Sequence, residues 1–129
     1  MNDKSSPIKI LIVDDEPDIL ESFKYLFEEA NSGYQCFCAP SGEEGIRLLE
    51  ERRPDVILLD LKLGKGINGI DFLKYTKRIS PETKVIVFTG YLDASLEAEA
   101  RSLGADGYLR KSFDRAEMIE STVRNVIAG

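Results

Sequence analysis

The stretch 55–60 constrains the fold more than any other part of the sequence. It reads Asp-Val-Ile-Leu-Leu-Asp, and its four consecutive aliphatic residues show no alternation of apolar and polar positions. Such a run is typical of a central strand covered by helices on both faces, and it is too short for a helix. The stretch ends in Asp60, and the carboxyl ends of the strands are where open α/β sheets bind their ligands.

Four further apolar runs predict strands at 8–13, 34–39, 85–89 and 107–109. Apolar residues at helical spacing predict a helix after each of the five strands, beginning near Pro17, Ser41, Asn68, Ala94 and Asp114. Right-handed crossovers between such strands give a parallel sheet sandwiched between helices. The sequence therefore predicts one doubly wound α/β domain with five strands and five helices, over residues 8–128, after a disordered tail at 1–7.

Local signals mark several of the helix ends. Ser41 and Glu44 have the spacing of a capping box, and Asn68 is expected to cap the third helix. Asp114 and Glu117 are expected to cap the last helix in the same way. Between Ile19 and Ala30 the apolar residues predict one uninterrupted helix.

Polar residues follow four of the apolar strands, all at the same edge of the predicted sheet: Asp14 and Asp15, Asp60, Thr89, and Lys111. Three carboxylates brought close together repel one another unless a cation lies among them. Hard oxygen ligands with room for water suit Mg²⁺. An ammonium and a hydroxyl would then face the remaining oxygens of a phosphoryl group.

This set of groups fits phosphoryl transfer, in which catalysis consists mostly of positioning and charge stabilisation. A carboxylate can itself be the nucleophile and become an aspartyl phosphate. Asp60 is the expected acceptor because it stands alone on the central strand, whereas Asp14 and Asp15 are adjacent and better placed to hold a metal.

Composition excludes several other functions. The chain has no histidine and only two cysteines, which rules out the usual zinc cage and any phosphohistidine chemistry within the chain. Cys36 and Cys38 are two apart in a predicted strand and are expected to be reduced thiols on one face. A net charge of -6 argues against direct nucleic-acid binding. No apolar run is long enough to cross a membrane and no secretory signal precedes the domain, so we expect a cytoplasmic protein.

From Ile8 to Ala128 the sequence resembles the receiver domain of two-component response regulators, the CheY-like superfamily. The resemblance is carried by Val13-Asp14-Asp15-Glu16, by Leu58-Leu59-Asp60-Leu61 with Asn68-Gly69 after it, by Val87-Phe88-Thr89-Gly90, and by residues 104–111, which read Gly-Ala-Asp-Gly-Tyr-Leu-Arg-Lys. It implies a flavodoxin-like sheet with strand order 2-1-3-4-5.

The resemblance also implies roles and partners. A sensor histidine kinase or a histidine phosphotransfer protein would supply the phosphoryl group, and a homodimer could form on phosphorylation. Asp15, Asp60 and the backbone carbonyl of Lys62 would be direct Mg²⁺ ligands, with Asp14 acting mainly through water. Lys111 would pair with the phosphoryl group, Thr89 would move to bind it, and Tyr108 would turn inward with Thr89. The chain would then be a signalling switch that promotes only its own phosphorylation and dephosphorylation.

The sequence departs from the family pattern in three places. Ser112 follows Lys111 at a position where proline is usual, which leaves open whether the peptide bond between Lys111 and Ser112 is cis. The loop after Asp60 has Gly64 where proline is common and appears one residue longer. Tyr91 and Lys62 occupy positions that tune the lifetime of the phosphoaspartate, and the bulk of Tyr91 is expected to prolong it.

Two other classes of function compete with the signalling switch. The first is a phosphorylation-independent interaction module on the same fold. The second is an enzyme of similar architecture. Against it, Asp14-Asp15-Glu16 would repel a flavin phosphate, Glu16 departs from the haloacid-dehalogenase pattern, and no nucleotide-binding loop occurs.

Overall fold

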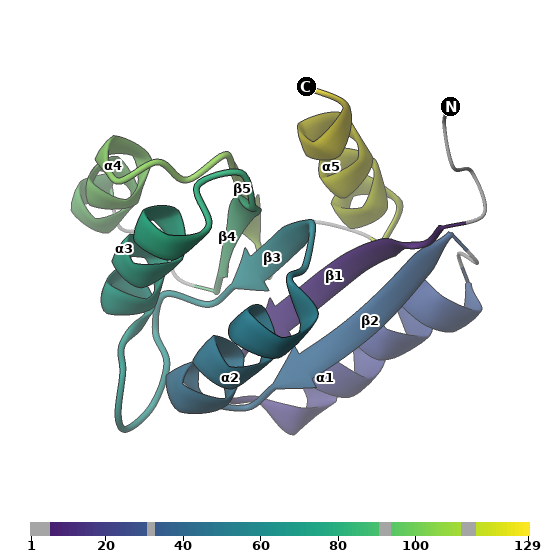
Figure 1. Cartoon of the computed structure of the whole chain (residues 1–129), viewed down its shortest axis with the longest axis horizontal. Coiled ribbons are helices and arrows are strands. Elements are labelled where there is room, and N and C mark those ends of the chain that lie inside the picture. The colour runs from purple at the N-terminus through teal and green to yellow at the C-terminus, as the bar shows by residue number, and fades with distance from the viewer. Residues whose placement is uncertain (1–5, 31–32, 91–93, 112–115) are drawn as a thin grey trace.

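The computed structural model describes residues 6–30, 33–90, 94–111 and 116–129. Its five parallel strands lie in the order β2-β1-β3-β4-β5, as the resemblance implied (Figure 1). The strands are β1 (Ile8–Val13), β2 (Tyr34–Ala39), β3 (Val56–Leu59), β4 (Lys84–Thr89) and β5 (Gly107–Arg110). The helices are α1 (Pro17–Lys24), continued by the π-helical turn η1 (Tyr25–Glu29), then α2 (Gly42–Arg52), α3 (Gly69–Ile79), α4 (Ala94–Ser102) and α5 (Ala116–Ala128).

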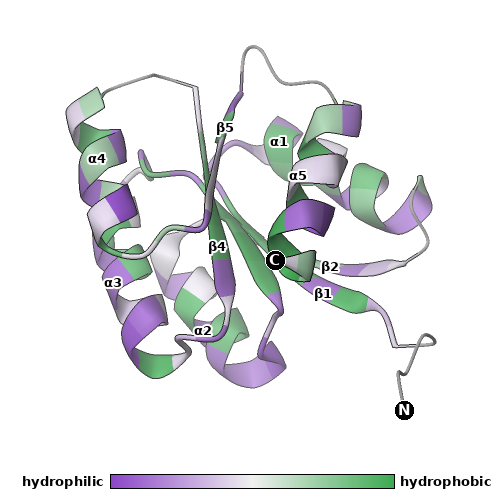
Figure 2. Cartoon of the chain, turned by 90° about the horizontal axis from the view of Figure 1, so that it is seen from above, coloured by the Kyte–Doolittle hydropathy of each residue, from purple (hydrophilic) through white to green (hydrophobic). Residues whose placement is uncertain are grey.

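The sheet separates two hydrophobic cores. On one face Ile10 and Ile12 of β1 pack with Phe23, Phe27 and Val123, under α1, η1 and α5. On the other face α2, α3 and α4 cover the alternate side chains of the same strands. In Figure 2, which shows the molecule from above, α1 and α5 lie across the sheet from α2, α3 and α4. The doubly wound prediction is therefore confirmed.

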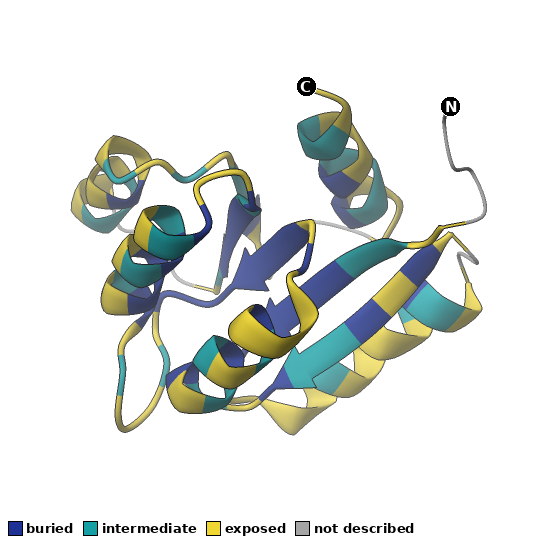
Figure 3. Cartoon of the chain, viewed as in Figure 1, coloured by how far each residue is buried: buried dark blue, intermediate teal, exposed yellow. Residues whose placement is uncertain are grey.

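Strand β3 lies at the centre of the sheet, and all four of its residues are buried (Figure 3). It pairs with β1 on one side and with β4 on the other. Because helices cover both of its faces, apolar residues are needed at every position, which explains the lack of alternation in its sequence.

Two of the predicted caps are present in the structure. The Ser41 hydroxyl accepts a hydrogen bond from the Glu44 backbone N–H at 3.2 Å, although the Glu44 carboxylate pairs with Arg47. The Asn68 side chain accepts from the Asp71 N–H at 2.8 Å and so caps α3. The expected cap at Asp114 lies outside the described residues.

The segment predicted as one helix from Ile19 to Ala30 changes geometry at Tyr25. The Ala30 N–H donates to the Tyr25 carbonyl at 3.0 Å, which closes a wider, π-helical turn. This turn lets Phe27 be buried completely, with its ring 6.2 Å from that of Phe23 and 4.9 Å from that of Tyr34. The wider turn thus serves the packing of the aromatic core.

The two cysteines behave as the sequence predicted. Cys36 and Cys38 are free thiols, and both pack into the core beneath α1 and α5. Among the helices that the structure describes, none has the length and apolar character needed to cross a lipid bilayer.

Candidate functional site

Backbone hydrogen bonds of the sheet place the carboxylates of Asp14 and Asp60 at the same edge. The Asp60 N–H donates to the Val13 carbonyl at 2.9 Å, and the Asp14 N–H donates to the Ala39 carbonyl at 3.0 Å. The hydrogen-bonded ladder therefore continues to the first residue beyond β3 and β1. This pairing holds Asp14 and Asp60 on neighbouring strands of the sheet.

Asp14, Asp15 and Asp60 form a cluster in which one oxygen from each lies within 4.8 Å of the others. Asp14 and Asp60 are only 1% and 4% exposed, whereas Asp15 is exposed. The cluster thus has two carboxylates held in the protein and one at the opening to solvent. The three side chains that the sequence predicted to converge do so.

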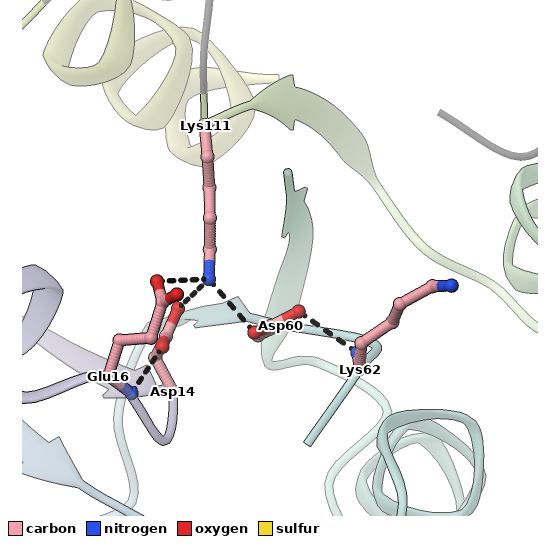
Figure 4. Close-up of polar contacts among 5 residues, drawn as sticks. All are labelled: Asp14, Glu16, Asp60, Lys62 and Lys111. Carbon is pink, nitrogen blue, oxygen red and sulfur yellow. Dashed lines mark hydrogen bonds and ion pairs between the residues drawn. The ribbon is translucent and has the colours of Figure 1, made fainter. Parts of the chain in front are cut away.

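Lys111 reaches this cluster from the end of β5. Its Nζ lies 2.7 Å from Asp14 Oδ2, 2.9 Å from Asp60 Oδ2 and 3.1 Å from Glu16 Oε1 (Figure 4). The Lys111 N–H donates to the Thr89 carbonyl at 3.0 Å, which fixes the start of the side chain beside β4. The ammonium therefore lies directly between the carboxylates of β1 and β3.

The electrostatics of the cluster favour a bound cation. Burial, helped by the charge of Asp60, raises the pKa of Asp14, and the contacts with Lys111 and the Glu16 N–H only partly offset this. Burial by itself would lower the pKa of Lys111, but hydrogen bonds to Asp14 and Asp60 raise it, so the ammonium keeps its charge. One ammonium among three clustered carboxylates leaves a negative site.

The donor atoms fit Mg²⁺ in particular. All three side chains offer hard carboxylate oxygens, and exposed Asp15 leaves room for water ligands. Backbone N–H groups orient two of these carboxylates, because Glu16 donates to Asp14 Oδ1 at 2.8 Å and Lys62 donates to Asp60 Oδ1 at 2.9 Å. The three predicted carboxylates thus lie together, and the Lys62 side chain points away from them (Figure 4).

Thr89 and Tyr108 lie on the neighbouring strands β4 and β5. Thr89 ends β4 and pairs in register with Arg110, one residue before Lys111. Tyr108 pairs in register with Val87, and its ring lies 4.3 Å from the guanidinium carbon of Arg101 on α4. Tyr108 therefore connects β5 with α4.

One contact of the site was not predicted. Glu16 pairs with Lys111, although the sequence suggested no role for it in the pocket. The signal was present, since Glu16 directly follows two acidic residues at the end of a strand. The predictions about Tyr91 and about the bond between Lys111 and Ser112 fall outside the described residues.

Comparison with known proteins agrees with this geometry. The family model of the response regulator receiver domain matches residues 10–123. Sporulation initiation phosphotransferase F of Bacillus subtilis is 37% identical over 110 residues, which cover 85% of this chain and 86% of that protein. The transcriptional regulatory protein ComA of the same organism is 32% identical over 122 residues, and there the chain spans only 56% of its relative.

Solved structures show the same fold. A CheY-like response regulator receiver domain protein from Methanospirillum hungatei superposes with a TM-score of 0.84 at 30% identity, over 94% of both chains. A response regulator receiver domain protein from Clostridium thermocellum superposes with a TM-score of 0.83 at 35% identity, over 93% of this chain and 94% of the other. The chain therefore belongs to the family of response regulator receiver domains.

Proposed function

We propose that this receiver domain works by accepting a phosphoryl group on Asp60 from a phosphohistidine of a partner protein, with Mg²⁺ bound. The observation that carries the proposal is the contact of 2.9 Å between Lys111 Nζ and Asp60 Oδ2 inside a cluster of three carboxylates. An isolated structural ion pair would not need two further acidic groups beside it.

In the proposed step an oxygen of the Asp60 carboxylate attacks the phosphorus. A bond from oxygen to phosphorus forms as the bond from the histidine nitrogen breaks, and the electron pair stays on the imidazole, which takes up a proton. Lys111 balances charge on the phosphoryl oxygens, and the Lys62 N–H orients the attacking carboxylate. Asp15, Asp60 and the Lys62 carbonyl would hold Mg²⁺ directly and Asp14 would hold it through water, and the ion would supply further charge stabilisation for the phosphoryl oxygens.

The response to phosphorylation would run through Thr89 and Tyr108. A phosphoryl group on Asp60 offers an acceptor to the Thr89 hydroxyl, and movement of Thr89 gives Tyr108 space to turn inward. Tyr108 contacts Arg101 of α4, so the surface of α4, β5 and α5 would change with it. A cytoplasmic histidine kinase or phosphotransfer protein would be the donor, and a homodimer through this surface would be one route to an output.

The test is phosphorylation by a small donor. Incubation with acetyl phosphate and Mg²⁺ should add the mass of one phosphoryl group to the protein, and Asp60→Asn should abolish the gain. Asp55→Asn is the matched control because it changes an aspartate at the opposite end of the same strand, where Asp55 accepts from the Lys9 N–H at 2.8 Å. A wild-type protein that neither gains mass nor binds Mg²⁺ would refute the proposal and favour a phosphorylation-independent interaction module.

A further inference from the structure

The loop between β3 and α3, residues 61–68, borders the carboxylate cluster. Its Lys62 N–H donates to Asp60 Oδ1 at 2.9 Å, and a Cβ added at Gly64 would lie 3.0 Å from Asp15 Oδ2. The loop contains glycine at 64 and 66 and has no proline. Glycines lose more conformational freedom on ordering than other residues, so holding this backbone beside the cluster needs contacts from elsewhere.

Glu43, in the first turn of α2, makes such a contact at the far end of the loop. Its Oε2 accepts a hydrogen bond from the Ile67 N–H at 3.1 Å. The carboxylate lies flat against Gly66, where an added Cβ would be 2.4 Å from Oε2 and 2.7 Å from Oε1. Gly66 has a φ of 91°, so both its backbone conformation and the closeness of Glu43 favour glycine there.

The backbones of α2 and the loop also meet directly. A Cβ on Gly42 would lie 2.8 Å from the carbonyl oxygen and from the Cβ of Ile67. At the end of the loop, a Cβ on Gly69 would lie 2.4 Å from the Leu61 Cα, so the two ends of the loop are in contact. The first turn of α2 therefore packs against the second half of this loop, at Gly66 and Ile67. The first half of the loop, with Lys62 and Gly64, lies beside Asp60 and Asp15.

We propose that Glu43 is a positioning residue for the metal and phosphoryl site. Its carboxylate tethers the loop at Ile67 and Gly66, and so keeps Lys62 and Gly64 in place beside Asp60 and Asp15. The inference rests on the proposed function, because it assigns Glu43 a part in forming that site. Glu43 supplies the restraint that a glycine-rich loop without proline lacks.

The hydrogen bond from the Ile67 N–H to Glu43, here called the tether, has to be distinguished from the negative charge of Glu43 as the cause of any change in Mg²⁺ binding. The loss of any nearby carboxylate weakens cation binding. Glu43→Ala removes both the charge and the hydrogen-bond acceptor, whereas Glu43→Gln removes the charge and keeps an oxygen that can accept from the Ile67 N–H. Glu44→Ala is the matched control: it removes the same charge from the same helical turn, but its carboxylate pairs with Arg47.

Two measurements on the whole chain decide the question. Hydrogen exchange of the Ile67 amide, followed by NMR in EDTA, should become about fivefold faster in Glu43→Ala, the loss expected for one net hydrogen bond. Magnesium affinity, measured by titration calorimetry, should be about tenfold weaker in the same variant, the lower end of the range for residues that support metal ligands. Glu43→Gln and Glu44→Ala should both stay close to wild type.

The outcomes separate the tether from the proposed function. Equal weakening of Mg²⁺ binding in Glu43→Ala, Glu43→Gln and Glu44→Ala would overturn the tether in favour of charge alone. An unchanged Ile67 exchange rate in Glu43→Ala would overturn it too, as would faster exchange with unchanged Mg²⁺ affinity. Failure of the wild-type chain to bind Mg²⁺ would instead count against the proposed function, and Ile67 exchange would still report on the hydrogen bond itself.

Discussion

The hydroxyl groups of Tyr34 and Tyr108 contribute differently to stability because only one of them has a hydrogen-bond partner among the described residues. Tyr34 donates to Glu120 Oε2 at 2.8 Å, and burial together with this hydrogen bond raises the pKa of its phenol. Tyr108 also buries its hydroxyl, but no hydrogen-bond partner for that oxygen lies among the described residues. A buried polar group without a partner costs free energy, whereas a paired one contributes to stability.

Removal of the two hydroxyls should therefore have opposite effects. Tyr34→Phe should lower the free energy of unfolding by about 1 kcal/mol, while Tyr108→Phe should leave it unchanged or raise it by up to about 1 kcal/mol. Urea unfolding followed by circular dichroism measures both, and each variant serves as the control for the other. A loss in Tyr108→Phe as large as that in Tyr34→Phe would mean that the Tyr108 hydroxyl is paired in solution.

For single residues, the sequence predicted which side chains form the site but not all of the contacts between them. The resemblance implied a switch role for Tyr108, which stays a prediction. The positions of Asp14, Asp15, Asp60 and Lys111 in the sequence predicted that they converge, and they do. The pairing of Glu16 with Lys111 was not predicted, because that contact joins residues that follow β1 and β5 and are 95 positions apart.

Among the elements, η1 and strand β2 are joined by a hydrogen bond between a side chain and the backbone. Strand β2 is at the edge of the sheet, and the Glu28 carboxylate in η1 accepts a hydrogen bond from the Cys36 N–H at 3.0 Å. Lys24 of α1 pairs with the same carboxylate at 3.1 Å. The bond from Cys36 and the contact with Lys24 lower the pKa of Glu28.

Glu28→Ala should lower the free energy of unfolding by about 1–2 kcal/mol at neutral pH, the range for a hydrogen bond to a charged group at a partly exposed site. The lowered pKa means that the unfolded chain binds the proton more tightly, so this contribution is present above the ordinary value of 4.5 and is lost as the pH falls through the folded pKa. The difference from wild type should thus shrink in acid.

Glu29→Ala is the matched control, because Glu29 lies in the same turn with an exposed side chain. Denaturant unfolding at a series of pH values provides the comparison. A deficit in Glu28→Ala that stayed constant from neutral pH to well below 4.5 would contradict a role for the ionised carboxylate.

The elements were largely predictable from local signals. The caps at Ser41 and Asn68 follow from side chains that bond to a backbone N–H three residues away, so neighbouring sequence is enough. The π-helical turn was not predictable, because the apolar spacing from Ile19 to Phe27 fits an ordinary helix. The contact between Phe27 and Tyr34, on another element, accompanies the wider geometry.

For the molecule as a whole, the buried charge of Asp14 costs stability at neutral pH. Asp14 is almost completely buried beside Asp60, and its pKa is raised above the ordinary value of 3.8. A raised carboxyl pKa means that the folded state binds the proton more tightly, so stability is lost as the pH rises through the interval between 3.8 and the folded pKa. At neutral pH this cost arises chiefly from desolvation of the Asp14 carboxylate and to a smaller extent from repulsion by Asp60, and a bound cation would offset it.

In EDTA at neutral pH, Asp14→Asn should raise the free energy of unfolding by roughly 1–3 kcal/mol, the desolvation penalty of a buried polar group, because burial is the main cause of the raised pKa of Asp14. The advantage should disappear below pH 3.8, where Asp14 is protonated in both states. Mg²⁺ at ten times its Kd should stabilise the wild type by about 1.4 kcal/mol and Asp14→Asn by less.

Thermal unfolding with EDTA and with Mg²⁺ measures both effects. Asp71→Asn is a suitable control, since Asp71 is an exposed aspartate in the first turn of α3. An Asp14→Asn protein that was less stable than wild type in EDTA would show that the ion pair with Lys111 outweighs the cost of burying the Asp14 charge.

The sequence by itself determined the class of fold and the edge of the sheet at which the functional groups gather. Unbroken apolar runs can be satisfied only by strands buried on both faces, and the residue after each run must emerge at the carboxyl end of the sheet. For that reason Asp14, Asp60 and Lys111 could be identified together without coordinates.

Only the tertiary structure decided which charges touch and how the surrounding backbone is held. The contacts of Lys111 with Glu16 and of Glu43 with Ile67 join residues that are far apart along the chain. Contacts of this kind depend on distances set by packing the helices onto the sheet, and no local pattern of residues encodes them. The class of fold therefore follows from local sequence, whereas the contacts that position the charged groups of the site follow from the packing of the whole molecule.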